Sequence, residues 1–197
     1  MKSINNTYYD PEEHKYYVNG EEKPSVTEIA NPISFERLDA LQKALVERAK
    51  ARGSRCHELA EEFWLAGEIN PEEIESDYLP YMQQFILWAK TYRPKVLYTE
   101  KQLFSEQFCG TCDLIIQLDG KTILVDYKFT ATADKKSLSV QLEGYKRLCD
   151  LYGVVVDECY YLHIKKDSYV FKPIKTDAEW FDILLRHNQK IKEKYNG

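Results

Sequence analysis

The chain has 197 residues, of which 44% are hydrophobic and 30% charged, and its formal net charge is −5. This length supports one substantial hydrophobic core, and the composition is that of an ordinary folded domain, which excludes wholesale disorder. No run of about 18 apolar residues occurs, and the amino terminus lacks the apolar stretch of a secretory signal. We therefore expect a single domain over residues 1–197, located in the cytoplasm and without a membrane partner.

The cysteines and the charged residues indicate which compartment and which ligands to expect. Five cysteines, an odd number, predict free thiols in a reducing compartment. Cys109 and Cys112 form a C-x-x-C pair, but the second pair that a structural zinc site needs is absent, so we expect no zinc. The net charge is unfavourable for binding nucleic acid, although local basic surface matters more than the total because salt screens charges beyond about 10 Å. The candidate basic residues are Lys135, Lys136, Lys146, Arg147, Lys165 and Lys166.

The amino-terminal segment predicts a small hairpin followed by a short helix. Tyrosines alternate around the D-P dipeptide at 10–11, and the N-G dipeptide at 19–20 is a strong turn signal. Ser25 has Glu28 three residues later, which is the pattern of a capping box at a helix start.

Helical periodicity follows. Apolar residues recur at helical spacing over 35–50, with Ser34 as the candidate cap of this helix. Gly53 is expected to end it before a separate helix at 54–66.

The remaining segments alternate between predicted helices and strands. The strands expected at 108–118 and 122–129 are joined by an Asp-Gly turn, a strong signal for a hairpin. The other expected elements are a helix at 71–92, a strand at 96–104, a helix at 138–152, strands at 158–165 and 169–173, and a helix at 177–195.

Five polar residues near the ends of these elements suggest one site. Asp126 and Lys128 are two apart on a strand and so face the same side, while the hairpin brings Asp113 alongside in a register that the pattern leaves open. Gln141 and Tyr145 are four apart on a helix and share a face. Carboxylates and an ammonium near an apolar sheet are costly unless they are paired or bind a cation. The pattern therefore predicts a divalent cation site.

Hard oxygen ligands of this kind suit Mg²⁺ or Mn²⁺. The expected ligands are Asp113, Asp126 and the main-chain carbonyl of Tyr127, which leaves Lys128 to orient or activate a water, or to hold a phosphate. Phosphodiester hydrolysis needs an activated water and stabilisation of the charge that develops on phosphorus and the leaving oxygen. A cation held by these residues can meet those needs.

Each residue also has an ordinary structural interpretation. A lone D-x-K at 126–128 is most often an exposed ion pair. Gln141 alone would be a capping amide, and Tyr145 alone a core tyrosine. His57 falls beside the apolar face of its helix, where histidine is usually a satisfied boundary residue, although imidazole is a competent ligand for Mn²⁺. Glu100 is expected at the surface.

Taken in order, the motifs resemble those of the PD-(D/E)xK nuclease superfamily, in particular its RecB-like branch and the phage-type recombination exonucleases. G-T-C-D at 110–113 is similar to the family's G-x-x-D, V-D-Y-K at 125–128 to its D/E-x-K, and Q-L-E-G-Y at 141–145 to its Q-x-x-x-Y. R-G-S-R-C-H at 52–57 is similar to the histidine motif of the branch, which would make His57 a metal ligand.

This resemblance implies an α/β restriction-endonuclease-like core, with a central mixed β-sheet flanked by α-helices and preceded by the N-terminal hairpin and helices. It implies a metal-dependent DNA exonuclease of phage or prophage recombination or repair that uses Mg²⁺ or Mn²⁺. The implied catalytic residues are Asp113, Asp126, Lys128, Gln141 and Tyr145, and the implied metal ligands are His57, Asp113, Asp126 and Tyr127. Gln141 and Tyr145 would help to place the DNA backbone or the lysine.

Linear DNA ends are the implied substrate. A single-strand annealing or single-strand-binding protein and further copies of the chain are candidate partners. Relatives with an iron-sulfur cluster use one early and three late cysteines, a pattern that is absent here, so we expect no cluster. Two alternatives stay open: a structure-specific endonuclease, and a nuclease-fold module that binds DNA or a protein without cutting.

Overall fold

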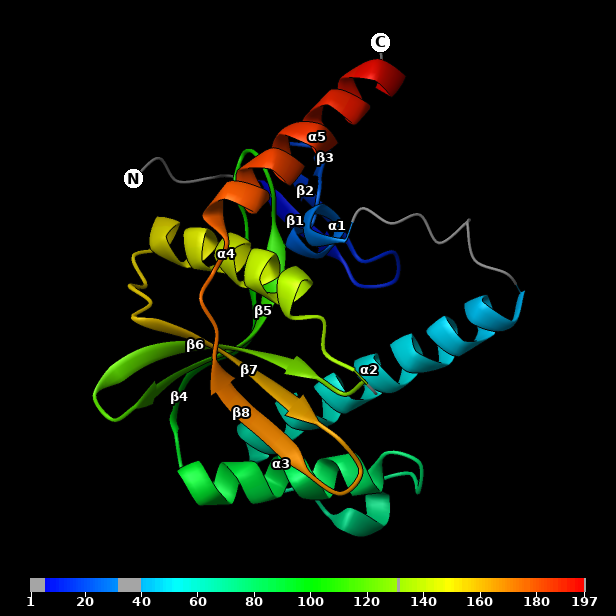
Figure 1. The fold of residues 1–197 in the computed structure, drawn as a ribbon, viewed down its shortest axis with the longest axis vertical. Helices are drawn as coiled ribbons and strands as arrows, with labels where there is room; N and C mark the ends of the chain where they lie inside the picture. Colours follow the sequence, from blue (N-terminus) through cyan, green and yellow to red (C-terminus); the bar gives the residue numbers. More distant parts are fainter. Residues whose placement is uncertain (1–5, 32–39, 131, 197) are drawn as a thin grey trace.

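A computed structural model of the chain describes residues 6–31, 40–130 and 132–196, and these build two sheets and a set of helices (Figure 1). In chain order, the elements are β1 (Thr7–Asp10), β2 (Lys15–Val18), β3 (Glu21–Lys23), α1 (Val26–Ala30), α2 (Ala40–Ala66), the 3₁₀ helix η2 (Pro71–Glu73), α3 (Leu79–Tyr92), β4 (Lys95–Leu103), β5 (Gly110–Leu118), β6 (Lys121–Lys128), α4 (Lys135–Leu151), β7 (Glu158–Ile164), β8 (Tyr169–Pro173) and α5 (Ala178–Asn196).

The central sheet has the strand order β4-β5-β6-β7-β8. All neighbouring strands are antiparallel except β6 and β7, which are parallel and are connected through α4. A parallel pair needs a crossover of this kind because a tight turn cannot return the chain to the same end of the sheet. The expected α/β architecture, a central mixed sheet flanked by helices and preceded by an N-terminal hairpin, is confirmed.

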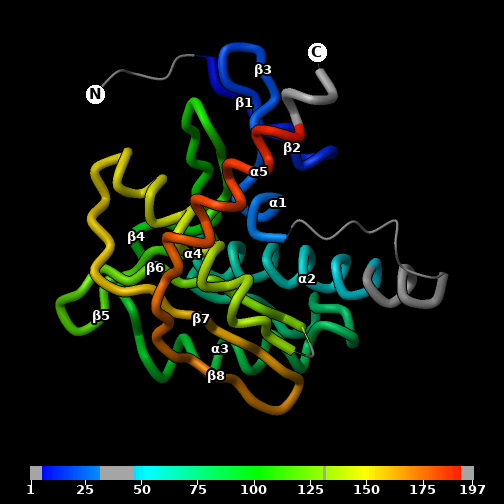
Figure 2. Tube along the Cα trace, turned by 45° about the horizontal axis from the view of Figure 1, so that its top comes forward, coloured from blue at the N-terminus to red at the C-terminus, as the bar shows by residue number. Residues whose placement is uncertain are grey.

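Helices cover both faces of this sheet. On one face, α2 and α3 enclose a core of aromatic rings, among them Phe63, Phe85, Trp88 and Tyr127. On the other face lie α1, α4 and α5, whose apolar side chains pack with those of β5, β6 and β7. Figure 2 shows α5 running from the end of β8 past α4 and α1 towards the N-terminal strands. Two apolar layers therefore hold the sheet between them.

The N-terminal hairpin is confirmed, and β3 extends it to a small sheet with the order β1-β2-β3. The expected helix start after it is also confirmed, because Ser25 and Glu28 form both hydrogen bonds of a capping box at α1. The backbone on both sides of this start is tied to the loop before β5: Val26 N donates to Cys109 O at 2.8 Å, and Cys109 N donates to Pro24 O at 3.0 Å.

Three predicted boundaries differ from the structure. Gly53 does not end a helix, since α2 is continuous through it, and a single glycine inside a helix costs only about 1 kcal/mol relative to alanine. The predicted helix at 71–92 is divided into η2 and α3. Helix α4 begins before the predicted residue 138, because the Asp134 side chain caps it by accepting from the backbone N–H groups of Lys136 and Ser137. Ser34 and residues 35–39 lie outside the described residues.

Two further findings concern the described residues as a set. No helix among them is both long enough and apolar enough to cross a membrane. All five cysteines are buried and have free thiols, as the odd number predicted.

Candidate active site

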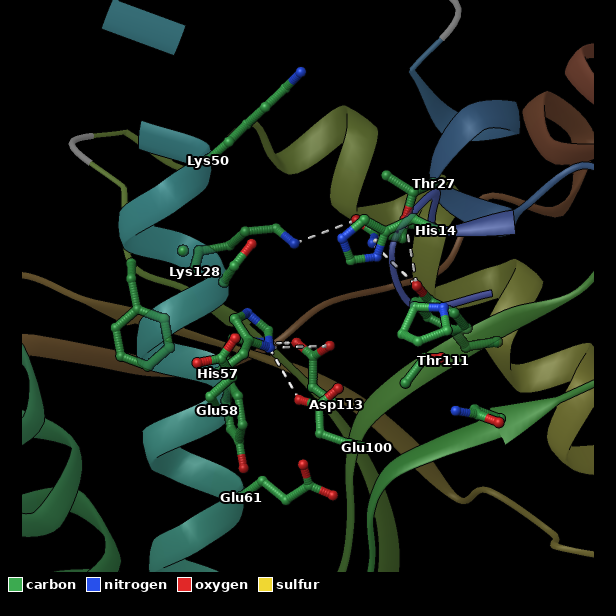
Figure 3. Close-up of a pocket in the computed structure, with 18 of the residues that line it drawn as sticks. His14, Thr27, Lys50, His57, Glu58, Glu61, Glu100, Thr111, Asp113 and Lys128 are labelled. Atoms are coloured by element: carbon green, nitrogen blue, oxygen red, sulfur yellow. Dashed lines mark hydrogen bonds and ion pairs between the residues drawn. The ribbon is translucent and has the colours of Figure 1, made fainter. Parts of the chain in front are cut away.

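A cavity of about 760 Å³ opens beside the central sheet (Figure 3). Its lining includes residues of β1, β2, α1, α2 and α4, together with side chains of β4, β5 and β6. The sequence-predicted residues in this lining are His57, Asp113, Tyr127, Lys128, Gln141 and Tyr145. Asp126 lies next to the lining, against Lys128.

Three potential metal-ligating side chains converge in the cavity. The ligand atoms of His57 on α2, Glu100 on β4 and Asp113 on β5 all lie within 4.8 Å of one another. His57 Nδ1 is 3.0 Å from Glu100 Oε1 and 3.7 Å from Asp113 Oδ1. Residues far apart in the sequence thus form one nitrogen and oxygen cluster, which is the composition that Mn²⁺ or Mg²⁺ sites use.

Glu100 was expected at the surface, and that expectation is wrong: its side chain is only 20% exposed and hydrogen-bonds His57. The β4 ladder pairs Thr99 with Leu114 and Lys101 with Cys112, and Glu100 between them has a φ of 43°. Such a left-handed conformation is uncommon for a glutamate and is often found at functional sites. The turn between β4 and β5 has no strong signal that sets the register, so the sequence could not place Glu100 opposite Asp113.

Mutual electrostatics shift the pKa values in this cluster. Burial lowers the pKa of His57, but the Asp113 and Glu100 carboxylates outweigh burial and raise it to about 9. Burial raises the pKa of Asp113, and Glu100 adds to the effect while His57 opposes it. A histidine in this setting is protonated at neutral pH, and a cation that binds it must displace the proton.

Asp126 and Lys128 occupy the same side of β6, as the strand alternation predicted. Lys128 Nζ lies 2.6 Å from Asp126 Oδ2. Asp126 is only 1% exposed, and burial raises the pKa of its carboxyl to about 6 even though Lys128 opposes the shift. Apart from this close ion pair with Lys128, neither Asp126 oxygen has a polar partner among the described residues. Buried carboxylate oxygens without a donor have acceptor capacity left for another positive group.

The main chain of Tyr127 contacts the site, whereas its side chain points to the opposite face of the sheet. Its backbone N–H donates to Asp113 Oδ2 at 2.6 Å, which holds the Asp113 carboxylate beside the β6 backbone. Its ring packs between α2 and α3, where the hydroxyl accepts a hydrogen bond from Trp64 Nε1 at 2.9 Å. The main chain of Tyr127 thus belongs to the site and its side chain to the core. Its carbonyl as a metal ligand stays a prediction.

The predicted pair on α4 points into the site. Gln141 Oε1 accepts from Lys128 Nζ at 3.4 Å, and Gln141 Nε2 donates to Tyr145 OH at 3.4 Å and to Thr27 Oγ1 at 3.3 Å. Thr27 of α1, which sequence reasoning missed, also lies 3.4 Å from the Tyr145 hydroxyl. A chain of polar contacts therefore links α1 and α4 to Lys128.

The glycines in two of the motifs have a steric role. A Cβ added at Gly110 would come within 2.7 Å of the Tyr145 ring. A Cβ added at Gly144 would lie 2.6 Å from the Phe181 ring and 2.8 Å from Val26, so a side chain there would push α4 away from α1 and α5. Only a residue without a side chain allows these close approaches.

Two further residues hold the chain immediately after Lys128. Arg52 Nε on α2 donates to the Phe129 carbonyl oxygen at 2.8 Å, and His163 Nε2 on β7 donates to the Thr130 carbonyl oxygen at 2.7 Å. Arg52 is the first residue of the R-G-S-R-C-H segment at 52–57, in which only His57 was assigned a role, and His163 falls in none of the motifs. They become significant only because α2 and β7 flank the end of β6.

The predicted basic surface is only partly present. Arg147 is engaged in ion pairs with Glu143 and Asp182, so it is not free for a ligand. Lys135 and Lys136 at the start of α4, and Lys165 and Lys166 after β7, are exposed.

No family profile matches this sequence, and no curated protein matches it in sequence. Among solved structures, the chain is similar to a phage-related exonuclease from Haemophilus somnus 129PT, with 18% identity, 88% of this chain and 92% of that chain covered, and a TM-score of 0.48. It is also similar to an alkaline exonuclease from Laribacter hongkongensis, with 14% identity, coverages of 88% and 93%, and a TM-score of 0.43. The same alkaline exonuclease in complex with dAMP gives 14% identity, the same coverages and a TM-score of 0.44.

Proposed function

We propose that this chain is a metal-dependent DNA exonuclease of the PD-(D/E)xK superfamily, acting as a single nuclease domain in the cytoplasm in phage or prophage recombination or repair. The observation that carries the proposal is the convergence, beside one cavity, of the His57, Glu100 and Asp113 cluster with the buried pair of Asp126 and Lys128. This group unites four elements and matches the chemistry that phosphodiester hydrolysis needs.

The donor set fits a hard divalent cation. Three ligand atoms already lie within 4.8 Å of one another, and the Asp126 oxygens are buried without hydrogen-bond partners. Mg²⁺ or Mn²⁺ would be held by the side chains of His57, Glu100, Asp113 and Asp126 and by the Tyr127 carbonyl. When bound, such a cation supplies charge stabilisation at phosphorus and lowers the pKa of a water. Glu100 is an addition to the ligand set that the sequence suggested.

Lys128 acts in this proposal as a cationic donor. Burial lowers its pKa, but the Asp126 and Asp113 carboxylates outweigh burial and raise it, so the ammonium keeps its proton at neutral pH. It is therefore suited to orient the attacking water and to stabilise negative charge on the phosphate, and not to remove a proton. Gln141, itself held by Thr27 and Tyr145, fixes the direction of the ammonium.

The proposal is tested by incubating wild-type protein with end-labelled linear DNA and with closed-circular DNA, in Mg²⁺, in Mn²⁺ and in chelator. The matched variant is Asp126→Asn, which keeps the side-chain volume and removes the carboxylate charge. We expect release of acid-soluble nucleotides from linear DNA only, in the presence of metal only, and from the wild type only.

Other results would redirect the assignment. Nicking of the circle would establish an endonuclease. DNA binding without cleavage under either metal would establish the non-cutting module. Full activity of Asp126→Asn would refute the site. A change in the rate of cleavage on adding a single-strand annealing or single-strand-binding protein would support such a protein as a partner. The mass of the protein in solution tests whether further copies of the chain associate.

A further inference from the structure

We propose that the N-terminal sheet forms a stacking wall, made of Tyr9 and His14, which packs against a nucleobase of the DNA strand beside the bond to be cut. This inference rests on the proposed nuclease function and adds a binding subsite to it. The two side chains line the same cavity as His57 and Asp113. In Figure 3, His14 lies across the cavity from the α2 residues, with the Asp113 and Glu100 carboxylates between the two sides.

The stacking wall is built on a rigid base. The Tyr9 ring lies 4.7 Å from the ring of Tyr16, which is buried and packs in turn against Phe104 with ring centroids 5.9 Å apart. The Tyr16 hydroxyl is 2.8 Å from Thr111 Oγ1, and Thr111 precedes Asp113 by two residues on β5. The wall is thus anchored to the strand that carries part of the metal-ligating cluster. Packed rings therefore set the position of the Tyr9 ring relative to the reactive groups.

The outer surface of the wall is accessible and aromatic. Tyr9 is half-buried and His14 is exposed, and the Tyr9 hydroxyl hydrogen-bonds His14 Nδ1 at 2.8 Å. That bond leaves Nε2 of His14 for another partner. His14 has a φ of 54°, an uncommon conformation for a side-chain-bearing residue, which places its imidazole at the tip of the β1-β2 hairpin.

The chemistry of this wall suits a base better than a phosphate. The positive charge that a phosphate needs would come from the cation held by the His57, Glu100 and Asp113 cluster and from Lys128. An aromatic surface instead stacks on the π-face that every base has. Stacking is tolerant of sequence, which is a property that an enzyme degrading arbitrary DNA requires. The cavity volume is in the range of pockets that enclose a ligand of nucleotide size.

The same hairpin supplies a matched control. Tyr8 is adjacent to Tyr9 on β1, but its ring projects to the opposite face, where it is 57% exposed and packs near Tyr17. Tyr8 does not line this cavity. Tyr8→Leu and Tyr9→Leu are therefore the same substitution at neighbouring positions, and only the second removes a ring from the proposed wall.

The experiment measures fluorescence anisotropy of a labelled single-stranded oligonucleotide in Mg²⁺, with cleavage blocked by Asp126→Asn in every variant. An abasic position is moved along the oligonucleotide in a series of otherwise identical probes. We expect Tyr9→Leu to weaken binding of the intact strand about tenfold, within the roughly fivefold to hundredfold range of one lost base stack. Tyr9→Phe should recover most of that loss, and Tyr8→Leu should bind as the parent does.

The abasic series separates stacking from general damage. At one position, removing the base should weaken binding by the parent protein, which carries only Asp126→Asn, as much as Tyr9→Leu weakens binding of the intact strand. The Tyr9→Leu variant should bind that abasic probe as tightly as it binds the intact strand. In the cleavage-competent protein, the same variant should raise KM and leave kcat nearly unchanged.

Three results would overturn the inference: equal binding by Tyr9→Leu and the parent, an equal loss on intact and abasic probes, or an effect of Tyr8→Leu as large as that of Tyr9→Leu. A wild-type protein that cleaves DNA while Tyr9→Leu behaves normally refutes the stacking wall alone. A wild-type protein that neither binds nor cleaves DNA refutes the proposed function and the wall together.

Discussion

The two faces of the central sheet differ in what their side chains do. On the face covered by α2 and α3, Phe85, Trp88 and Tyr127 are buried and contact one another through their rings. On the face covered by α4, Asp126 and Lys128 take the equivalent positions on β6 and interact with polar partners. Because strand residues alternate between faces, β6 contributes to both environments within three residues.

The aromatic face contributes mainly to the stability of the fold, and the polar face holds the groups of the proposed site. The aromatic face gains stability from burying apolar area, and a loss there should appear as a lower free energy of unfolding. The polar face keeps a buried carboxylate, that of Asp126, whose pKa is raised and whose oxygens have no partner but the Lys128 ammonium among the described residues. Such an arrangement costs stability and is typical of functional sites. Substitutions on the two faces should therefore have opposite signatures, and four predictions test that contrast.

The largest effect is expected on the polar face. Asp113→Asn should reduce DNA cleavage by at least about 10⁴-fold, which corresponds to about 5.5 kcal/mol, because it removes one carboxylate of the cluster. The amide can still accept the hydrogen bond from the Tyr127 N–H. Burial, helped by Glu100, raises the pKa of Asp113 by more than His57 and Lys128 lower it, so the charged carboxylate costs stability that a neutral amide does not. Without metal, its thermal midpoint should equal or exceed that of the wild type. A large loss of stability would show that Asp113 has a structural role.

The aromatic face should show the reverse. Phe85→Ala removes a fully buried ring and should lower the free energy of unfolding by about 3–5 kcal/mol, measured by urea titration. The rate of cleavage per folded molecule should change far less than in Asp113→Asn. If activity per folded molecule fell equally, the two faces would not be functionally separate.

The third prediction concerns pH. Since the pKa of His57 is raised to about 9, a proton must leave the imidazole when metal binds below that pH. Affinity for Mn²⁺, measured by titration calorimetry, should rise up to about tenfold per pH unit between about pH 7 and 9 and then level off. Asp126, with a pKa of about 6, is ionised throughout this window.

The metal-free protein should respond in the opposite direction. A histidine with a raised pKa contributes stability that is present below its unfolded value of 6.5 and is lost as the pH rises through about 9. In chelator, the free energy of unfolding should therefore fall over this window. His57→Gln should lack both the rise in metal affinity and this loss of stability, and a variant that kept them would contradict the assignment.

The smallest effect links the two faces. Arg52 of α2 donates to the Phe129 carbonyl oxygen just beyond Lys128. Arg52→Met should lower kcat about tenfold by loosening the end of β6, with little change in the affinity for metal. Arg55→Met is the control, because Arg55 lies on the same helix and pairs with Glu58, Glu62 and Glu75 instead. Equal losses of kcat in the two variants would argue for a general effect on α2.

Local signals in the sequence were sufficient for much of this protein. The Asp-Gly turn placed β5 and β6 side by side, and strand alternation put Asp126 and Lys128 on one face. Helical spacing put Gln141 and Tyr145 on one face of α4, and Gln141 on that face accepts a hydrogen bond from Lys128. These features depend on contacts within a hairpin or within one helical turn, where periodicity and turn chemistry determine the geometry. Their functional roles stay proposals.

Only the tertiary structure decided the remainder of the site. Glu100 reaches His57 because a left-handed residue interrupts the β4 ladder opposite Asp113, and Thr27 reaches Gln141 because two glycines let α1 and α4 approach. Tyr9 and His14 join the cavity because the N-terminal sheet is anchored through Tyr16 to Thr111 of β5. Each of these contacts joins segments separated by tens of residues. Such contacts depend on sheet register and helix packing, which one sequence does not encode in any local pattern.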